Sequence, residues 1–256
     1  MKRLITALAL LVPAILSYGQ NVPAPVAAEK GLVLEYKTTT AEGAEMLSKR
    51  EVVYVKDEGN RKIVGIKDIG TPLEGMSQEQ FDRLSTTEYV LTDNSWYIDV
   101  IGKTGNMMKE MMEAAGEMEE AELFKNLDIR VDAGESRNPV FPNVMSPGEN
   151  REFDPVKIKV KIAFFSVTCE IRYEMYECIG TESLTVPAGT FETYIVEQQV
   201  LVKQKSLLGG DKQREYERTW YAPGIGEVKT QSLDKNGSMV EETVLNAITR
   251  GVEHRQ

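Results

Sequence analysis

The chain has 256 residues, of which 41% are hydrophobic and 27% are charged, and its formal net charge is −10. This composition is typical of a globular protein with a substantial hydrophobic core. The acidic balance argues against binding to nucleic acid or to an anionic membrane, because both would repel the protein.

The N-terminal segment has the pattern of a secretory signal. Two basic residues precede an apolar run from Leu4 to Leu16, and small residues follow where a signal peptidase cuts. The run is shorter than the roughly 20 residues that a membrane-spanning helix needs. We therefore expect residues 1–19 to be a cleaved signal peptide and the mature protein, with no membrane span, to be periplasmic or secreted. No cysteine lies near the junction, so we do not expect a lipoprotein.

The remaining chain is predicted to form one folded unit. Residues 20–30 carry two prolines among small residues and are predicted to be a leader. Residues 31–250 are predicted to be a single domain, because no linker inside them is long enough to mark a boundary. The polar segment 251–256 is predicted to be a flexible tail.

The first half of the domain shows the period-two alternation of strands. Ser77 and Gln80 have the spacing of a helix capping box and predict a short helix. The strands predicted here are 32–36, 50–56, 62–67, 88–91, 96–100 and 127–131.

A methionine-rich segment predicts an amphipathic helix over residues 106–125. Its apolar residues recur at helical spacing, and glutamates occupy the other side. The methionines of this face are Met107, Met108, Met111, Met112 and Met118.

The second half is almost entirely strand-like, with turns rich in proline and glycine. Between Val186 and Phe191, Pro187 and Gly189 predict a three-residue hairpin loop of type I with a bulge. Pro223 and Gly224 fit a type II turn. The strands predicted here are 156–164, 167–175, 195–202, 216–221, 225–233 and 239–248.

These elements predict a mainly β fold. Consecutive strands joined by hairpins make an antiparallel sheet. About twelve strands are too many for a flat open sheet, so we expect it to curl into a roll or partial barrel around one inserted helix and a short second helix.

The two cysteines, Cys169 and Cys178, form an even pair in a chain that we expect to be exported. On one straight strand their Cα atoms would lie about 30 Å apart. A disulfide needs them within about 7 Å. We therefore predict two free, buried thiols.

The order of these features resembles the TapB-like family of exported proteins, found mainly in Bacteroidota. The matching residues are Glu182, the T-x-P-A-G-T-F segment that ends at Phe191, the W-Y-x-x-G-x-G-x-V-K segment from Trp220 to Lys229, and the D-K-x-G hairpin at Asp234. The resemblance implies a rolled antiparallel sheet outside the cytoplasm and no established catalytic activity. The family often has a cysteine where this chain has Thr193, which weakens any shared redox site.

The Met-rich face is the sharpest candidate for a binding surface, because methionine side chains repack around varied apolar partners. The aromatic residues expected at the rim of the roll could extend it: Trp96, Tyr97, Trp220 and Tyr221. The predicted partner is an apolar small molecule or an envelope protein. The alternative is that the methionines only fill the contact between helix and sheet.

No catalytic, cofactor-binding or metal-binding residue is predicted. The only histidine is His254, which excludes a Ser-His-Asp triad in practice and disfavours copper. The glutamates near residue 120 lack the Asp, Asn and Gly spacing of a calcium loop. Two alternatives stay open beside a non-catalytic binding protein. One is a structural or assembly component of the envelope that acts through sheet edges or a helix face, and the other is a carboxylate-based hydrolase.

Overall fold

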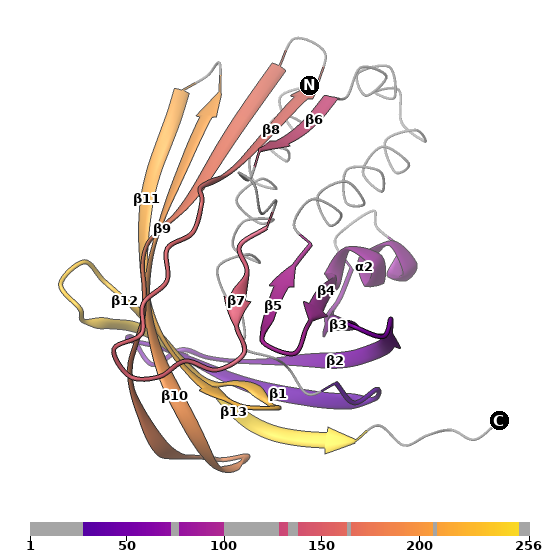
Figure 1. Cartoon of the computed structure of the whole chain (residues 1–256), viewed down its shortest axis with the longest axis vertical. Helices are drawn as coiled ribbons and strands as arrows, with labels where there is room; N and C mark the ends of the chain where they lie inside the picture. Colours follow the sequence, from indigo (N-terminus) through magenta and orange to yellow (C-terminus); the bar gives the residue numbers. More distant parts are fainter. Residues whose placement is uncertain are drawn as a thin grey trace.

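The computed structural model describes residues 28–72, 77–99, 128–132, 138–162, 165–206 and 209–250. These residues form one 13-stranded sheet with the order β6-β8-β9-β10-β11-β12-β13-β1-β2-β3-β4-β5-β7 (Figure 1). The elements are β1 (Leu32–Thr40), β2 (Glu45–Asp57), β3 (Lys62–Ile69), α2 (Gln78–Ser85), β4 (Thr86–Leu91), β5 (Ser95–Ile98), β6 (Asp128–Asp132), β7 (Phe141–Pro142), β8 (Val156–Ile162), β9 (Phe165–Val186), β10 (Gly189–Ser206), β11 (Gly209–Ala222), β12 (Gly226–Leu233) and β13 (Met239–Arg250).

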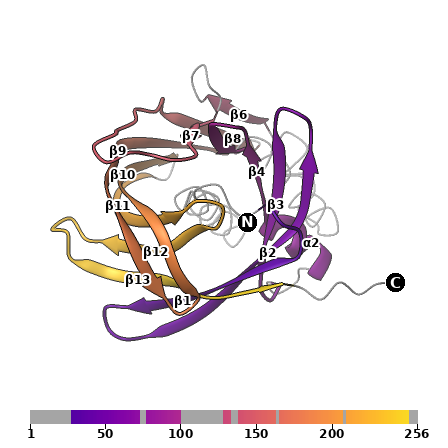
Figure 2. The ribbon, with the colours of Figure 1, turned by 60° about the horizontal axis from the view of Figure 1, so that its bottom comes forward.

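The predicted antiparallel roll is confirmed. Every pairing in the sheet is antiparallel, and neighbours in the sequence are mostly neighbours in space, with β13 joined to β1. The strands turn steadily around the molecule, so the sheet has a concave and a convex face (Figure 2). Phe141 on the edge strand β7 packs against Tyr173 and Tyr176 of β9, with ring centroids 5.6 and 5.4 Å apart. Aromatic packing thus brings one end of the sheet against the strands near its other end.

The predicted turn at Pro187 is wrong in its length. Gly189 pairs with Val186, so Pro187 and Ala188 alone form a two-residue loop between β9 and β10. Gly189 has a φ of +144°, which is outside the left-handed helical region that the bulged loop requires. The type II turn is confirmed, because Gly224 has a φ of +78° and Ile225 N–H donates to the carbonyl of Ala222 at 3.1 Å.

The short helix α2 begins as predicted. The Ser77 hydroxyl accepts from the backbone of Gln80, and the Gln80 side chain accepts from the backbone of Ser77, which completes the capping box. The predicted Met-rich helix, the signal peptide, most of the leader and the tail lie outside the described residues. In the described part of the chain, no helix is long and apolar enough to cross a membrane.

The hydrophobic core includes side chains of the concave face from both halves of the sheet, among them Leu34, Val64, Val196 and Leu245. Cys169 and Cys178 lie on the single strand β9, and both are free and buried, as predicted. Burial raises the pKa of both thiols, so they remain protonated at neutral pH.

Candidate functional site

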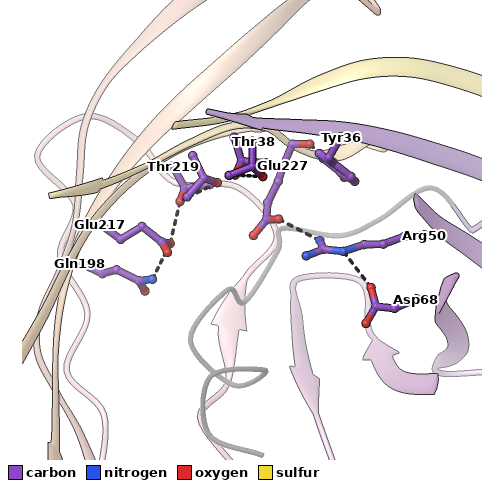
Figure 3. A network of polar contacts seen from close by, with 10 residues as sticks. Tyr36, Thr38, Arg50, Asp68, Gln198, Glu217, Thr219 and Glu227 are labelled. Atoms are coloured by element: carbon purple, nitrogen blue, oxygen red, sulfur yellow. Dashed lines mark hydrogen bonds and ion pairs between the residues drawn. The ribbon is translucent and has the colours of Figure 1, made fainter. Parts of the chain in front are cut away.

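A line of polar side chains crosses the concave face within this core (Figure 3). We call it the concave polar network. Its side chains come from β10, β11, β12, β1, β2 and β3. These are successive strands of the sheet, except that β13 lies between β12 and β1. Its members are Gln198, Glu217, Thr219, Thr230, Glu227, Tyr36, Arg50 and Asp68.

The centre of the network is an ion pair that spans the curved sheet. Arg50 on β2 places Nη1 3.1 Å from Oε2 of Glu227 on β12, although β1 and β13 lie between these strands. Three strand spacings would separate β2 from β12 by about 14 Å in a flat sheet. The Tyr36 hydroxyl on β1 also donates to the backbone carbonyl of Glu227, at 3.3 Å, across β13. Both contacts therefore depend on the curvature of the roll.

Arg50 is held from two sides. Its Nε lies 3.4 Å from Oδ1 of Asp68, which is its neighbour in register on β3. Burial is the largest single influence and disfavours the charge, but the combined attraction of Glu227, the two tyrosines nearby and Asp68 outweighs it and raises the pKa of Arg50. The guanidinium also lies over the ring of Tyr36, 5.0 Å from its centroid. Arg50 is therefore a fixed positive charge inside the roll.

Glu217 is the second carboxyl group of the network. Its Oε1 accepts from Gln198 Nε2 at 2.8 Å and from Thr219 Oγ1 at 2.9 Å. Burial, followed by the negative charge of Glu227, raises the pKa of this half-buried side chain to about 8. Glu217 is therefore mostly protonated at neutral pH and is able to donate as well as accept a hydrogen bond.

The buried polar atoms without a hydrogen-bond partner among the described residues include Oε1 of Glu227, which is 5% exposed, and Nε1 of Trp96, which is 1% exposed. Buried polar atoms in folded proteins are nearly always satisfied by protein or water. Both atoms therefore stand out as exceptions within the described core.

Aromatic side chains continue this face beyond the polar network. Trp96 stacks on Phe141 with centroids 4.7 Å apart, and Phe153, Tyr173 and Tyr176 surround Phe141. Tyr89 connects the two regions, because it packs near Trp96 and its pKa, raised by burial, also responds to Arg50 and Glu227. The concave face thus joins a polar half to an aromatic half.

The structure corrects the predicted rim aromatics. Trp96 and Tyr221 are each 1% exposed and Trp220 is 6% exposed, so all three belong to the core, whereas Tyr97 is half-buried. The ammonium of Lys229 covers the ring of Trp220 at 4.9 Å, and Nε1 of Trp220 donates to the Glu182 carboxylate. The error arises because a rolled sheet buries its concave face and long side chains cover large rings on the sheet. The five predicted methionines lie outside the described residues.

Sequence reasoning did not single out Arg50, Glu217 or Glu227. Arg50 begins the predicted strand 50–56, and Glu217 lies in the predicted strand 216–221, and neither residue stands out within its strand. The sequence offers a signal only for Glu227, a charged residue that stands between Gly226 of the turn and the apolar Val228. In the structure Val228 is fully buried. A pairing between strands that are not adjacent leaves no periodicity in the sequence.

The chemistry available at the network is recognition by charge and hydrogen bonds. Within the described ranges, no group of three or more His, Cys, Asp or Glu side chains is arranged to hold a metal ion. The two thiols are protonated, so neither is a ready nucleophile. What remains is a fixed cation, a carboxylate with one free oxygen and a neutral carboxyl group, beside stacked rings.

Comparison with known proteins identifies relatives by family and by fold. A protein-family model described as DUF3108-like matches residues 93–245. A crystal structure described as a putative lipoprotein from Parabacteroides distasonis is 20% identical, with a TM-score of 0.55 over 89% of this chain and 99% of that chain. A second, described as a putative exported protein with YmcC-like fold from Bacteroides fragilis, is 17% identical, with a TM-score of 0.54 over 89% and 100%. At these identities the likeness shows the fold. No curated protein sequence matches the chain.

Proposed function

The chain belongs to the DUF3108-like family, and on that premise we propose that it is a non-catalytic exported protein that binds a ligand on its concave face. The ligand we propose has an apolar body and a polar head. Phe153 and Tyr173, the partly buried rings of the aromatic half, suit the body, and the polar network suits the head. The proposed location is the periplasm or the cell exterior.

The observation that carries this proposal is the free Oε1 of Glu227. Leaving a buried acceptor unsatisfied costs about 1–3 kcal/mol, more when it is charged. A bound hydrogen-bond donor would remove that cost. The ion pair between Arg50 and the other oxygen of Glu227 would hold the carboxylate in position for that donor. Binding sites for small molecules commonly combine apolar walls with a few fixed polar groups in this way.

Export is supported by two independent observations. The N-terminal 19 residues have the signal-peptide pattern, and the two structural neighbours are described as a lipoprotein and an exported protein. We also propose that the signal peptide is cleaved without addition of a lipid anchor. The relationship to the TapB-like family is likewise part of the proposal. Mass spectrometry of the protein purified from its own cells tests the anchor, since an attached lipid would contradict it.

The predicted Met-rich face has a place in the same proposal. Met107, Met108, Met111, Met112 and Met118 would form a lid or docking face for the apolar part of the ligand. Oxidation of methionine to the sulfoxide makes the side chain polar and would weaken binding if this role is correct. Among the four predicted aromatic residues, Tyr97 is the one that is half-buried rather than buried.

Native mass spectrometry after mild extraction tests ligand binding directly. We expect the wild-type protein to carry a discrete added mass and Glu227→Gln to lose most of it, because the amide cannot supply the same anionic acceptor. Glu192→Gln is the matched control, since Glu192 is exposed on β10. A clean apo mass for the wild type, together with no uptake of a fluorescent fatty acid, would count against the proposal.

A second candidate is an assembly component of the envelope that acts through a sheet edge. It is favoured by the shape of β11, whose residues before Tyr216 have no neighbouring strand on the β12 side among the described strands. Crosslinking in cells separates the two candidates. A single recurrent protein partner would favour the second candidate.

A carboxylate-based hydrolase remains the third alternative. A neutral carboxyl group beside an ion-paired carboxylate is the composition of an acid and base pair. However, Glu217 and Glu227 are both tied to protein partners through one oxygen. Turnover of chromogenic glycosides by the wild type but not by Glu217→Gln would support the enzyme and overturn the non-catalytic proposal.

A further inference from the structure

A hollow of about 380 Å³ lies outside the concave face, where β11 and the end of β12 diverge (Figure 1). We call it the β11 notch. Tyr216 and Leu233 are the last residues in register between these two strands. Residues 212, 214 and 216 alternate along β11 and lie on the face opposite to Glu217, so the notch is separate from the concave polar network. Its lining residues are Lys212, Arg214, Tyr216, Leu233, Asp234 and Lys235.

The notch has a surplus of positive charge, because its lining has three basic residues and one acidic residue. Lys212 and Lys235 are exposed and form no ion pair in the part of the chain that the structure describes. Arg214 bonds to Glu174 through Nε at 2.8 Å and Nη2 at 3.5 Å, and its Nη1 has no hydrogen bond to a described residue. Two ammonium groups and one guanidinium nitrogen are therefore available to an anion.

The acidic residue of the notch can accept one more hydrogen bond. Asp234 Oδ1 accepts from the backbone N–H groups of Asn236 and Ser238, both at 2.8 Å, and these bonds lower the pKa of Asp234. Its Oδ2 accepts, among the described residues, a single bond of 3.3 Å from the side chain of Asn236. A carboxylate oxygen has two lone pairs, so Oδ2 has capacity left. Because a carboxylate repels an anion, the group that it receives is a neutral donor such as a hydroxyl.

Tyr216 and Leu233 supply the apolar wall of the notch. They lie opposite each other in register, and both are half-buried, so part of each side chain stays accessible. The face of an aromatic ring packs against flat, C–H-rich bodies. Hollows of roughly 300–1,000 Å³ that combine an apolar wall with a few polar groups are typical sites for small molecules.

We propose that the β11 notch binds a small acidic sugar, a saccharide that carries a phosphate or a carboxylate group. The sugar ring would lie against the apolar wall. Lys212, Lys235 and Nη1 of Arg214 would hold the anionic group, and a ring hydroxyl would donate to Oδ2 of Asp234. A neutral sugar lacks the charge that the lysines select, and an aromatic acid lacks the hydroxyl that Asp234 accepts. The site goes beyond the proposed function, because it uses no residue of the concave polar network.

Chemical-shift titration by NMR of the full mature protein tests the proposal, because it reports both a weak affinity and the location of the ligand. The probes are glucose 6-phosphate and glucuronate, which separate phosphate from carboxylate as the preferred anion. Three controls each lack one feature: methyl glucoside has no charge, benzoate has no hydroxyl, and inorganic phosphate has no ring. We expect at least one probe to bind about tenfold more tightly than every control and to weaken as salt rises. The backbone signals of residues 212–216 and 233–235 should shift.

Two variants test the residues that carry the proposal. Lys212→Gln/Lys235→Gln should weaken the preferred probe about tenfold, since it removes two attractions at exposed sites. Tyr216→Leu keeps an apolar wall but loses the flat ring, and it should weaken the probe about fivefold. Lys159→Gln, an exposed lysine on β8, is the matched control and should bind the probe normally.

Four outcomes would overturn the proposal. They are the absence of shifts with both probes, equal affinity for inorganic phosphate and glucose 6-phosphate, normal binding by the double lysine variant, and shifts confined to the concave face. If Tyr216→Leu lowers stability, the double lysine variant decides, because both lysines are exposed and their replacement leaves the apolar wall intact. None of these outcomes bears on ligand binding at the concave face except the last, which would support it.

Discussion

The two faces of β11 carry charged residues in opposite circumstances. Glu217 on the concave face has two neutral hydrogen-bond partners and a pKa of about 8, whereas Lys212 on the other face has no ion pair within the described ranges. Both residues belong to the same alternating strand. The difference shows that burial, rather than residue type, decides the role of a charged residue on this sheet. A buried one is held by protein partners and supports the fold, whereas an exposed one stays accessible to solvent.

The largest effect on stability is expected when the side chain of Arg50 is removed. Arg50→Ala leaves the buried carboxylate of Glu227 without its cation, and we expect a loss of about 3 kcal/mol in the free energy of unfolding. Urea denaturation measures it. Arg61→Ala is the matched control, because its ion pair with Glu58 is exposed, and its unfolding midpoint should not change. Equal effects of the two variants would mean that the ion pair of Arg50 contributes no more to the free energy of unfolding than an exposed ion pair does.

The second test uses pH. The pKa of Glu217 is raised in the folded state, so the unfolded chain loses this proton near pH 4.5 and the folded protein keeps it to about pH 8. Stability therefore falls as pH rises between these values, by roughly 2 kcal/mol after allowance for partial exposure. Glu217→Gln should flatten this part of the pH profile, and Glu192→Gln should not. An unchanged slope in Glu217→Gln would contradict a neutral state of this half-buried carboxyl group.

A smaller effect is expected from Tyr36→Phe. The variant removes only the hydroxyl that reaches the carbonyl of Glu227 at 3.3 Å across β13, so the expected loss is about 1 kcal/mol. Thermal unfolding measures it. Tyr97→Phe, on half-buried Tyr97, is the comparison. A gain in stability for Tyr36→Phe would show that this bond does not support the curvature of the roll.

The smallest effect is expected at two exposed lysines, Lys212 on β11 and Lys235 in the turn after β12. Lys212→Gln/Lys235→Gln should leave the unfolding midpoint nearly unchanged, because these exposed side chains form no ion pair in the described structure and act only as minor influences on Glu174 and Asp234. A marked fall in stability would show that Lys212 and Lys235 support the fold and would remove the contrast between the two faces of β11.

Local patterns were sufficient for much of the fold. Period-two alternation placed the strands, the Ser77 and Gln80 spacing placed the start of α2, and Gly224 marked its turn. The nine-residue separation of Cys169 and Cys178 on one strand was enough to predict free thiols. Each of these features depends on residues close together in the chain, so short-range stereochemistry determines them.

Tertiary structure alone decided the site. Arg50 and Glu227 are 177 residues apart in the sequence and lie on strands that do not pair, so only the curvature of the roll brings them together. The same curvature buried Trp96 and Tyr221, which the sequence placed at a rim. The alternation of a strand separates two faces but does not say which becomes concave, and that choice depends on how the whole sheet closes.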